Sequence, residues 1–222
     1  MKTVSTTLSI LLCALGVSAA VQGCTTTCVS GYYYGTVCYT TGYYYDSLVS
    51  GIDYETSLDG EVIRTGVTGE DDDPGRFLFI EDATVSFSLG GVSLGETVAK
   101  ERVTPFDLAG IVEEAVGECD LSGELPDDTS AFRRVANLAV LLQTLDTDGD
   151  DTNGIEIRPE VAALFERLTL DVDQASASFE ADGALLGLLD QANAESLFSS
   201  DRALVPRADA LRALYRGIGL CP

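Results

Sequence analysis

The sequence predicts an α+β fold in which a β half, residues 48–103, precedes a helical half, residues 104–222. Short runs of alternating apolar residues between turn residues indicate the β half, and apolar residues at helical spacing indicate the second half. The 222 residues are 45% hydrophobic and 22% charged, which is ordinary for a globular protein. The apolar face of each helix needs a partner, so we expect residues 48–222 to form one compact unit.

Residues 1–23 have the pattern of a secretory signal peptide. Lys2 provides a positive start, residues 8–17 are apolar but too short to span a bilayer, and small residues follow. The run Val21-Gln22-Gly23-Cys24 resembles a bacterial lipobox, which implies that Cys24 is lipidated and becomes the first residue. The alternative is ordinary cleavage after Val17-Ser18-Ala19, which gives a soluble secreted protein.

The cysteines favour the lipoprotein interpretation. The chain has six, and Cys13 leaves with the signal peptide in either case. Ordinary cleavage leaves five, whereas lipidation of Cys24 leaves an even set. We expect two disulfides, Cys28 with Cys38 and Cys119 with Cys221. By the resemblance to lipoproteins, the anchor carries palmitate and further acyl chains, and Thr25 gives no inner-membrane retention signal, so the outer membrane is the expected location.

Residues 24–47 combine Cys24 with a stretch rich in Tyr, Gly and Thr. The run Gly31-Tyr32-Tyr33-Tyr34-Gly35 returns as Gly42-Tyr43-Tyr44-Tyr45-Asp46, without a helical or alternating pattern. We interpret this stretch as a flexible tether that lifts the domain off the membrane. The alternative is an aromatic surface patch that contacts a protein or glycan partner.

Turn residues divide the β half into short antiparallel strands. Asp59-Gly60 and Gly90-Gly91 are signals of tight turns, and an acidic turn occupies residues 70–75. The pattern predicts a small meander or sandwich. The expected strands cover residues 49–55, 61–68, 76–80, 83–89, 92–94 and 97–103.

Helical spacing begins after residue 103. Thr104-Pro105 suits an N-cap followed by proline in the first turn, so a helix is expected to run to about residue 116. A stronger helix begins at Thr129 or Ser130 and presents an apolar stripe to a core. Further helices are expected at residues 159–168, 183–192 and 206–218.

Several stretches together resemble a module of bacterial exported and surface lipoproteins. They cover most of residues 48–218. The resemblance implies an envelope location and this fold, and it carries no particular activity. The stretches are Ser50-Gly51-Ile52-Asp53-Tyr54-Glu55-Thr56, Phe77-Leu78-Phe79, Val85-Ser86-Phe87-Ser88-Leu89-Gly90-Gly91, Leu94-Gly95, Val103-Thr104-Pro105-Phe106-Asp107-Leu108, and Asn137-Leu138-Ala139 through Asp146-Thr147-Asp148-Gly149-Asp150 to Asn153-Gly154-Ile155.

The loop at residues 146–154 is a candidate calcium site, because alternate carboxylates after a helix suit a hard cation with six to eight oxygen ligands. The expected ligands are the side chains of Asp146, Asp148 and Asp150, with a backbone carbonyl of Thr152 or Gly154 and with Glu156 or Glu160 as the source of a later oxygen. The loop lacks the EF-hand's glycine and terminal glutamate, so the expected Kd is about 10⁻⁴–10⁻³ M. The alternative is a polar turn in which glycines supply positive φ and the aspartates cap or face water.

A second acidic cluster, residues 70–73, has two interpretations. Consecutive carboxylates cannot all point at one ion, so a solvated charge cluster is favoured over a cation site. The cluster consists of Glu70, Asp71, Asp72 and Asp73.

Charge and composition exclude several functions. With 36 acidic and 13 basic residues the net charge is −23, which argues against nucleic-acid binding. The chain has no histidine, which removes the usual nucleophile pairs and zinc ligands. We therefore expect no enzyme but a lipid-anchored protein with a binding or structural display role, facing a protein or glycan partner at the cell surface. The alternative is a carboxylate-based hydrolase of envelope or extracellular polysaccharide, with Asp107 paired to Glu113 or Glu114.

Overall fold

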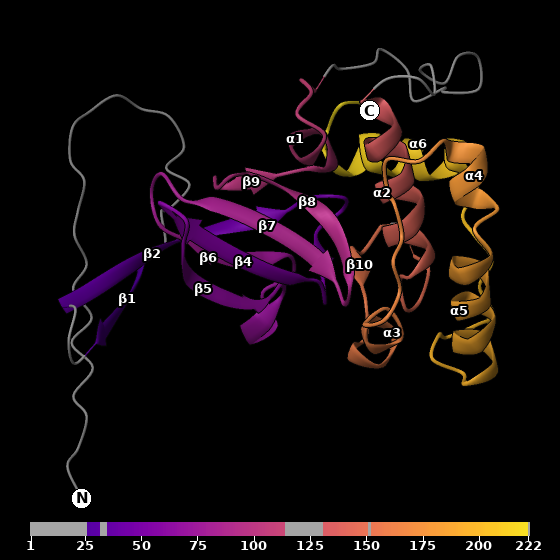
Figure 1. Cartoon of the computed structure of the whole chain (residues 1–222), viewed down its shortest axis with the longest axis horizontal. Coiled ribbons are helices and arrows are strands. Elements are labelled where there is room, and N and C mark those ends of the chain that lie inside the picture. Colours follow the sequence, from indigo (N-terminus) through magenta and orange to yellow (C-terminus); the bar gives the residue numbers. More distant parts are fainter. Residues whose placement is uncertain (1–25, 32–34, 114–130, 151, 222) are drawn as a thin grey trace, which may run out of the picture.

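The computed structural model describes residues 26–31, 35–113, 131–150 and 152–221 and confirms the α+β class. The strands of the first half and the helices of the second lie side by side (Figure 1). The proposed signal peptide and Cys24 lie outside the described residues, as do Cys119 and Glu114. Among the described residues, no helix is both long and apolar enough to cross a membrane.

One sheet has the expected meander character. It contains β4 (Asp53–Leu58), β5 (Glu61–Val67), β7 (Thr84–Leu89) and β8 (Val92–Val98) in the order β5-β4-β7-β8. All its pairs are antiparallel. The turn glycines Gly60 and Gly90 have positive φ, as the sequence predicts for tight connections.

The other sheet corrects the prediction of a tether. It contains β1 (Thr26–Gly31), β2 (Gly35–Tyr44), β6 (Arg76–Phe79) and β9 (Arg102–Val103). β2 pairs antiparallel with β1 and β6 and parallel with β9. The low-complexity stretch therefore enters the fold, and Tyr44 is fully buried. Tyr and Thr favour strands, and this preference outweighs the dilution by glycine.

The two sheets pack against each other through aromatic rings. Tyr44 of β2 and Phe77 of β6 contact Phe87 of β7 in the other sheet, with ring centroids 4.9 and 5.3 Å apart. Gly42 is required by this packing, because a Cβ there would lie 2.4 Å from the Phe77 ring. β1 and the start of β2 project from the end of the sandwich that lies away from the helices (Figure 1).

The strand expected at residues 49–55 is split in two. Val49–Ser50 forms β3, Gly51 turns with φ 90°, and β4 starts at Asp53. β3 pairs parallel with β10 (Ile155–Glu156), which follows the candidate calcium loop. The expectation of purely antiparallel strands is thus wrong for β2–β9 and β3–β10. Both parallel pairs join strands that are far apart in the sequence, so no tight turn connects them.

Helix α1 (Pro105–Leu108) is much shorter than expected. The cap is correct, since Thr104 and Asp107 form a capping box, but the helix ends before Gly110, which has φ 67°. α2 (Phe132–Thr144) begins two or three residues later than the expected start at Thr129 or Ser130. It is buried on nearly all sides, including the polar residues Asn137 and Gln143.

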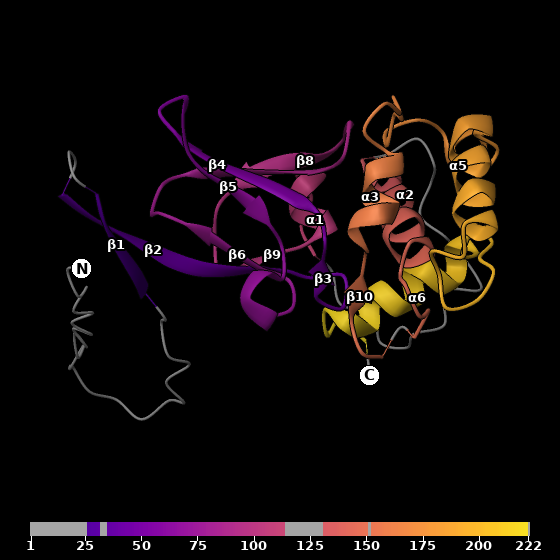
Figure 2. The same ribbon diagram turned by 90° about the horizontal axis from the view of Figure 1, so that it is seen from below.

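The remaining helices surround α2 (Figure 2). α6 (Arg207–Gly217) crosses α2, and α5 (Gly183–Ala194) lies at the outer edge. α3 (Pro159–Leu164) is shorter than expected, and α4 (Ser176–Glu180) is not among the predicted helices. The acidic turn forms a short 3-10 helix, η1 (Glu70–Asp72).

Cys38 and Cys221 are each disulfide-bonded. Cys28 and Cys38 are direct partners in the register of β1 and β2. The pairing Cys28–Cys38 and Cys119–Cys221 stays a prediction.

Two glycines with similar backbone conformations provide a test of the β3–β10 connection. In Gly51→Ala the new Cβ would lie 1.9 Å from the carbonyl oxygen of Ile157, whereas at Gly60, with φ 83°, it would meet nothing within 4 Å. We expect Gly60→Ala to lower the free energy of unfolding by about 1 kcal/mol, because only the positive φ is penalised. Gly51→Ala should lose about 1–3 kcal/mol more through overpacking.

Urea unfolding of both variants measures the difference. Equal losses in the two variants would contradict the proposed close approach of Gly51 to Ile157.

Candidate functional site

The candidate site is built around the acidic loop, defined here as residues 146–156, between α2 and the end of β10. Its first carboxylate, Asp146, is 3% exposed. One carboxylate oxygen accepts a hydrogen bond from the N–H of Gly149 at 2.6 Å, and the other accepts from the N–H of Glu156 at 2.9 Å. Burial raises the pKa of Asp146 and the charge of Asp148 adds to this, while the two N–H donors act in the opposite direction.

The other carboxylates of the acidic loop are exposed. Asp148 accepts hydrogen bonds from the N–H of Asp150 and from the side-chain amide of Asn153, both at 2.9 Å. These bonds, led by that of Asp150, lower the pKa of Asp148. Asp150 accepts from the N–H and hydroxyl of Thr152 at 3.0 and 2.6 Å. The loop thus has the internal bonds expected of a polar turn, with positive φ at Gly149 and Gly154.

Arg202, which is not among the predicted site residues, contacts the acidic loop from a segment near the C-terminus. Its guanidinium donates to the backbone carbonyl of Asp146 at 2.7 Å and lies 3.9 Å from the Asp146 carboxylate. A Cβ at Gly149 would lie 1.8 Å from this guanidinium, so the glycine admits it. The contact joins residues 56 positions apart, which no local motif can reveal.

The acidic turn, residues 70–73, lies across from the loop. Asp71 forms an ion pair with Arg76 at 2.9 Å, and Asp73 accepts a hydrogen bond from the Tyr43 hydroxyl at 3.3 Å. Asp71 and Asp72 have φ of 63° and 58°, so the exposed turn is tight. Arg76 therefore neutralises part of the cluster, as expected of a solvated charge group.

Acidic residues of both halves line one pocket of about 400 Å³, called here the junction pocket. Asp72 comes from the acidic turn, and Asp146, Asp148 and Glu156 come from the acidic loop. Gly154 also lines it, while Asp150 does not, and Thr152 lines a neighbouring pocket instead. Within the described ranges, no three acidic or cysteine side chains are grouped so that they could hold a metal ion as they stand. The structure thus brings together part of the expected ligand set, including Glu156, and adds Asp72.

No protein-family model, curated protein or solved structure matches this chain. The function has to be argued from the junction pocket and from the sequence.

Asp107 and Glu113, the carboxylates of the hydrolase alternative, form hydrogen bonds and ion pairs around the start of α1. Asp107 pairs with Lys100 at 2.6 Å and accepts from the N–H of Thr104 at 2.9 Å. Glu113 pairs with Arg102 at 2.8 Å and accepts from the Thr104 hydroxyl at 2.7 Å. Asp107 lines a shallow pocket to which Glu113 does not contribute.

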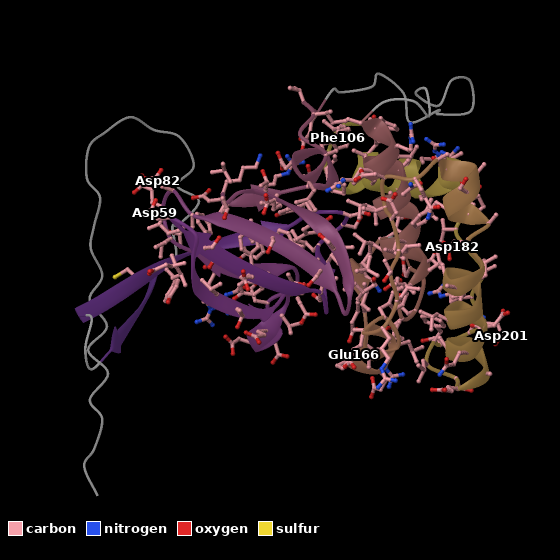
Figure 3. All side chains as sticks on the ribbon, viewed as in Figure 1. Asp59, Asp82, Phe106, Glu166, Asp182 and Asp201 are labelled. Carbon is pink, nitrogen blue, oxygen red and sulfur yellow. The ribbon has the colours of Figure 1, made fainter. Side chains whose placement is uncertain are left out.

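Other acids are dispersed over the molecule. Figure 3 shows Asp59 and Asp82 at the far end of the sandwich and Glu166, Asp182 and Asp201 at separate places on the helical half. A glycosidase needs two carboxyl groups facing one bond. The three labelled acids of the helical half lie apart from one another (Figure 3).

The acidic loop contains a buried carboxylate, Asp146, and an exposed one, Asp150, and their substitutions should differ in effect. In Asp146→Asn an amide NH₂ replaces one of two oxygens that accept backbone N–H bonds, so a buried donor faces a donor. We expect a loss of about 1–3 kcal/mol in the free energy of unfolding. Asp150→Asn, at an exposed position with local bonds only, should change it by less than about 0.5 kcal/mol. Urea denaturation of both proteins without added divalent cations measures the pair, and similar losses would contradict the burial of Asp146.

Proposed function

We propose that this is a lipid-anchored cell-envelope protein with a non-catalytic binding or structural display role, and that its junction pocket binds Ca²⁺. The observation that carries the calcium proposal is the convergence of the acidic turn and the acidic loop. Each cluster comes from a different half of the chain, and Asp72, Asp146 and Asp148 line the same pocket. A cation there would join the two halves.

Electrostatic repulsion is the physical reason to expect a cation. The chain has a net charge of −23, and four carboxylates line the junction pocket. Like charges at short range raise the free energy of the ionised state, and a divalent cation relieves it. Ser50 and Asn153, whose side chains carry further oxygens, also line the pocket. An irregular set of oxygens suits Ca²⁺, which accepts variable geometry, better than Mg²⁺, which demands an octahedron.

The polar-turn alternative is also supported by the structure, because the carboxylates of the acidic loop already accept hydrogen bonds. The two interpretations differ in what must move. Asp146 is buried and fixed, whereas Asp148 and Asp72 are exposed and can turn towards an ion. Removal of one exposed carboxylate therefore tests the site without disturbing the core.

We expect Ca²⁺ to raise the melting temperature of the full-length protein by a few degrees. An ion that binds only the folded state at ten times its Kd stabilises that state by about 1.4 kcal/mol, which corresponds to a few degrees in a protein of this size. Asp148→Asn and Asp72→Asn should each abolish most of the shift. Asparagine tolerates the positive φ of residue 72, so that variant adds little backbone strain.

Asp190→Asn is the matched control, because it removes the same charge from an exposed position on α5. Millimolar Ca²⁺ and Mg²⁺ are titrated separately during thermal melts. Equal shifts with both ions, or an undiminished calcium shift in both pocket variants, would mean charge screening and would overturn the calcium proposal.

The anchor has its own test. We expect mass spectrometry of the mature protein to find Cys24 as the first residue, carrying diacylglycerol, because the lipobox resemblance and the cysteine parity both remove it from the thiols. The variant Cys24→Ser should lose the lipid and leave the membrane fraction. An unmodified wild-type chain beginning at Ala20 would contradict the anchor and support a secreted protein.

A further inference from the structure

Asp46 is a fully buried acid at the contact between the β half and the helical half. It is 0% exposed, and it lies in the turn between β2 and β3. One carboxyl oxygen accepts a hydrogen bond from the side-chain amide of Gln143 on α2 at 2.9 Å. The same amide donates to the carbonyl of Ala210 on α6 at 3.0 Å. This chain of contacts joins the sandwich to both central helices.

The second carboxyl oxygen of Asp46 has no hydrogen-bond partner among the described residues. An ionised carboxylate in such a place loses its hydration and regains a single neutral donor, whereas a protonated carboxyl carries no net charge to desolvate. Geometry alone therefore favours the protonated form in the folded state.

The groups that face Asp46 do not offset its charge. From β2 it faces Tyr44, whose buried hydroxyl also lacks a partner among the described residues. From α2 it faces the neutral amide of Gln143, which also donates to the carbonyl of Ala210 on α6. The charged residues next to Ala210 on α6, Asp209 and Arg212, pair with each other at 2.6 Å.

The turn that carries Asp46 is strained and closely packed. Ser47 and Leu48 both have positive φ, 65° and 62°. A Cβ at Gly217 would lie 2.2 Å from the Ser47 hydroxyl oxygen, and one at Gly154 would lie 2.9 Å from the Ser47 carbonyl oxygen. Such a conformation persists only where its surroundings hold it. The turn therefore depends on its contacts with α6 and with the acidic loop.

We propose that Asp46 is a pH-sensitive latch: its protonated carboxyl holds the turn at residues 45–48 against α2 and α6, and its ionised carboxylate loosens that contact. The proton lost on ionisation passes to solvent. Burial raises the pKa of Asp46 from 3.8 to about 7, and the Gln143 hydrogen bond acts in the opposite direction. The latch needs neither a bound cation nor the lipid anchor.

The direction of the pH effect follows from linkage. The folded pKa lies above the ordinary one, so the stabilisation is fully present below the ordinary pKa of aspartate. It is lost as the pH rises from about 4 to about 7 and stays lost above that range. Loosening is therefore complete in mildly alkaline conditions and reversed by acidification.

The direct test is ¹³C NMR of the aspartate carboxyl carbons in the folded full-length protein, with residue-specific assignment. We expect the Asp46 signal to titrate with a midpoint near 7. A midpoint below about pH 5 would overturn the proposal. This measurement needs no variant, so it stands even if substitution of Asp46 prevents folding.

The consequence for stability is tested with Asp46→Asn, which keeps the shape and cannot ionise. Relative to this variant, the unfolding equilibrium constant of the wild type should rise about tenfold per pH unit between roughly pH 5 and 7 and then level off. Asp190→Asn, a charge-matched exposed control, should follow the wild type at every pH. Parallel pH profiles for the wild type and Asp46→Asn would contradict the latch.

Gln143→Met supplies a readout that a purely structural role would not move. The hydrogen bond from Gln143 lowers the Asp46 pKa, so its removal should move the NMR midpoint to higher pH. An unchanged midpoint, or one moved to lower pH, would show that Gln143 does not act on the carboxyl and would overturn the chain of contacts on which the latch depends.

Discussion

The pairing of β3 with β10 is the constraint on which the site depends. Two short strands, far apart in the sequence, join through hydrogen bonds from the N–H of Ile155 to the Leu48 carbonyl and from the N–H of Ile157 to the Ser50 carbonyl. The approach is so close that Gly51 and Gly154 admit no side chain. This pairing fixes the end of the acidic loop against the sandwich, and so it places Asp146 and Asp148 opposite Asp72. Without it the two acidic clusters would be independent surface features.

Because the chain carries a large negative charge, carboxylates that are buried or crowded together need nearby positive charge or hydrogen-bond donors. Arg76, Arg134 and Arg202 each pair with acidic groups that lie elsewhere in the chain or across a turn. In the pairs of Arg76 and Arg134 the carboxylate is exposed, and such pairs contribute little stability, so their main effect is to relieve repulsion where chain segments meet. In the pair of Arg202 the Asp146 carboxylate is buried. The arginines are few, with 13 basic residues against 36 acidic ones. Most carboxylates must therefore face water, bind an ion or be held by backbone N–H groups.

Local signals in the sequence were sufficient for the elements that depend on local physics. The turns at Gly60 and Gly90, the N-cap at Thr104 and the apolar stripe of α2 follow from backbone freedom, hydrogen bonding and side-chain spacing, and each of these predicted features exists. The stretch containing β1 and β2 was mistaken for a tether because glycine dilutes its pattern. Gly42 is there to admit the Phe77 ring, a tertiary requirement. β10 has two residues, too few for any periodicity.

The residues of the candidate site also fall into those that a local motif predicts and those that only tertiary packing brings there. Asp146, Asp148 and Gly154 belong to a motif that can be read directly, and the structure places them at the pocket. Asp72 was considered only as part of a separate cluster, because nothing in the sequence says that the two turns meet. Arg202 and Asp46 could not be found at all. An aspartate after a tyrosine run looks solvent-exposed, and only the packing of α2 and α6 buries it.

Asp146 and Asp46 show why burial alone does not decide how a carboxylate behaves. Both are nearly inaccessible, at 3% and 0% exposure, and burial raises the pKa of each. Asp146 accepts two backbone N–H bonds and has a guanidinium within 3.9 Å. Asp46 accepts one bond from a neutral side chain. Fixed N–H dipoles and a nearby cation favour the ionised form, so Asp146 can keep its charge where the loop turns. Asp46 has neither, so protonation is the remaining way to lower the free energy of its buried carboxyl. The carboxylate of Asp146 is thus stabilised in its ionised form by backbone N–H groups of its own loop. The carboxyl of Asp46, which is buried between the two halves of the chain, is more stable protonated.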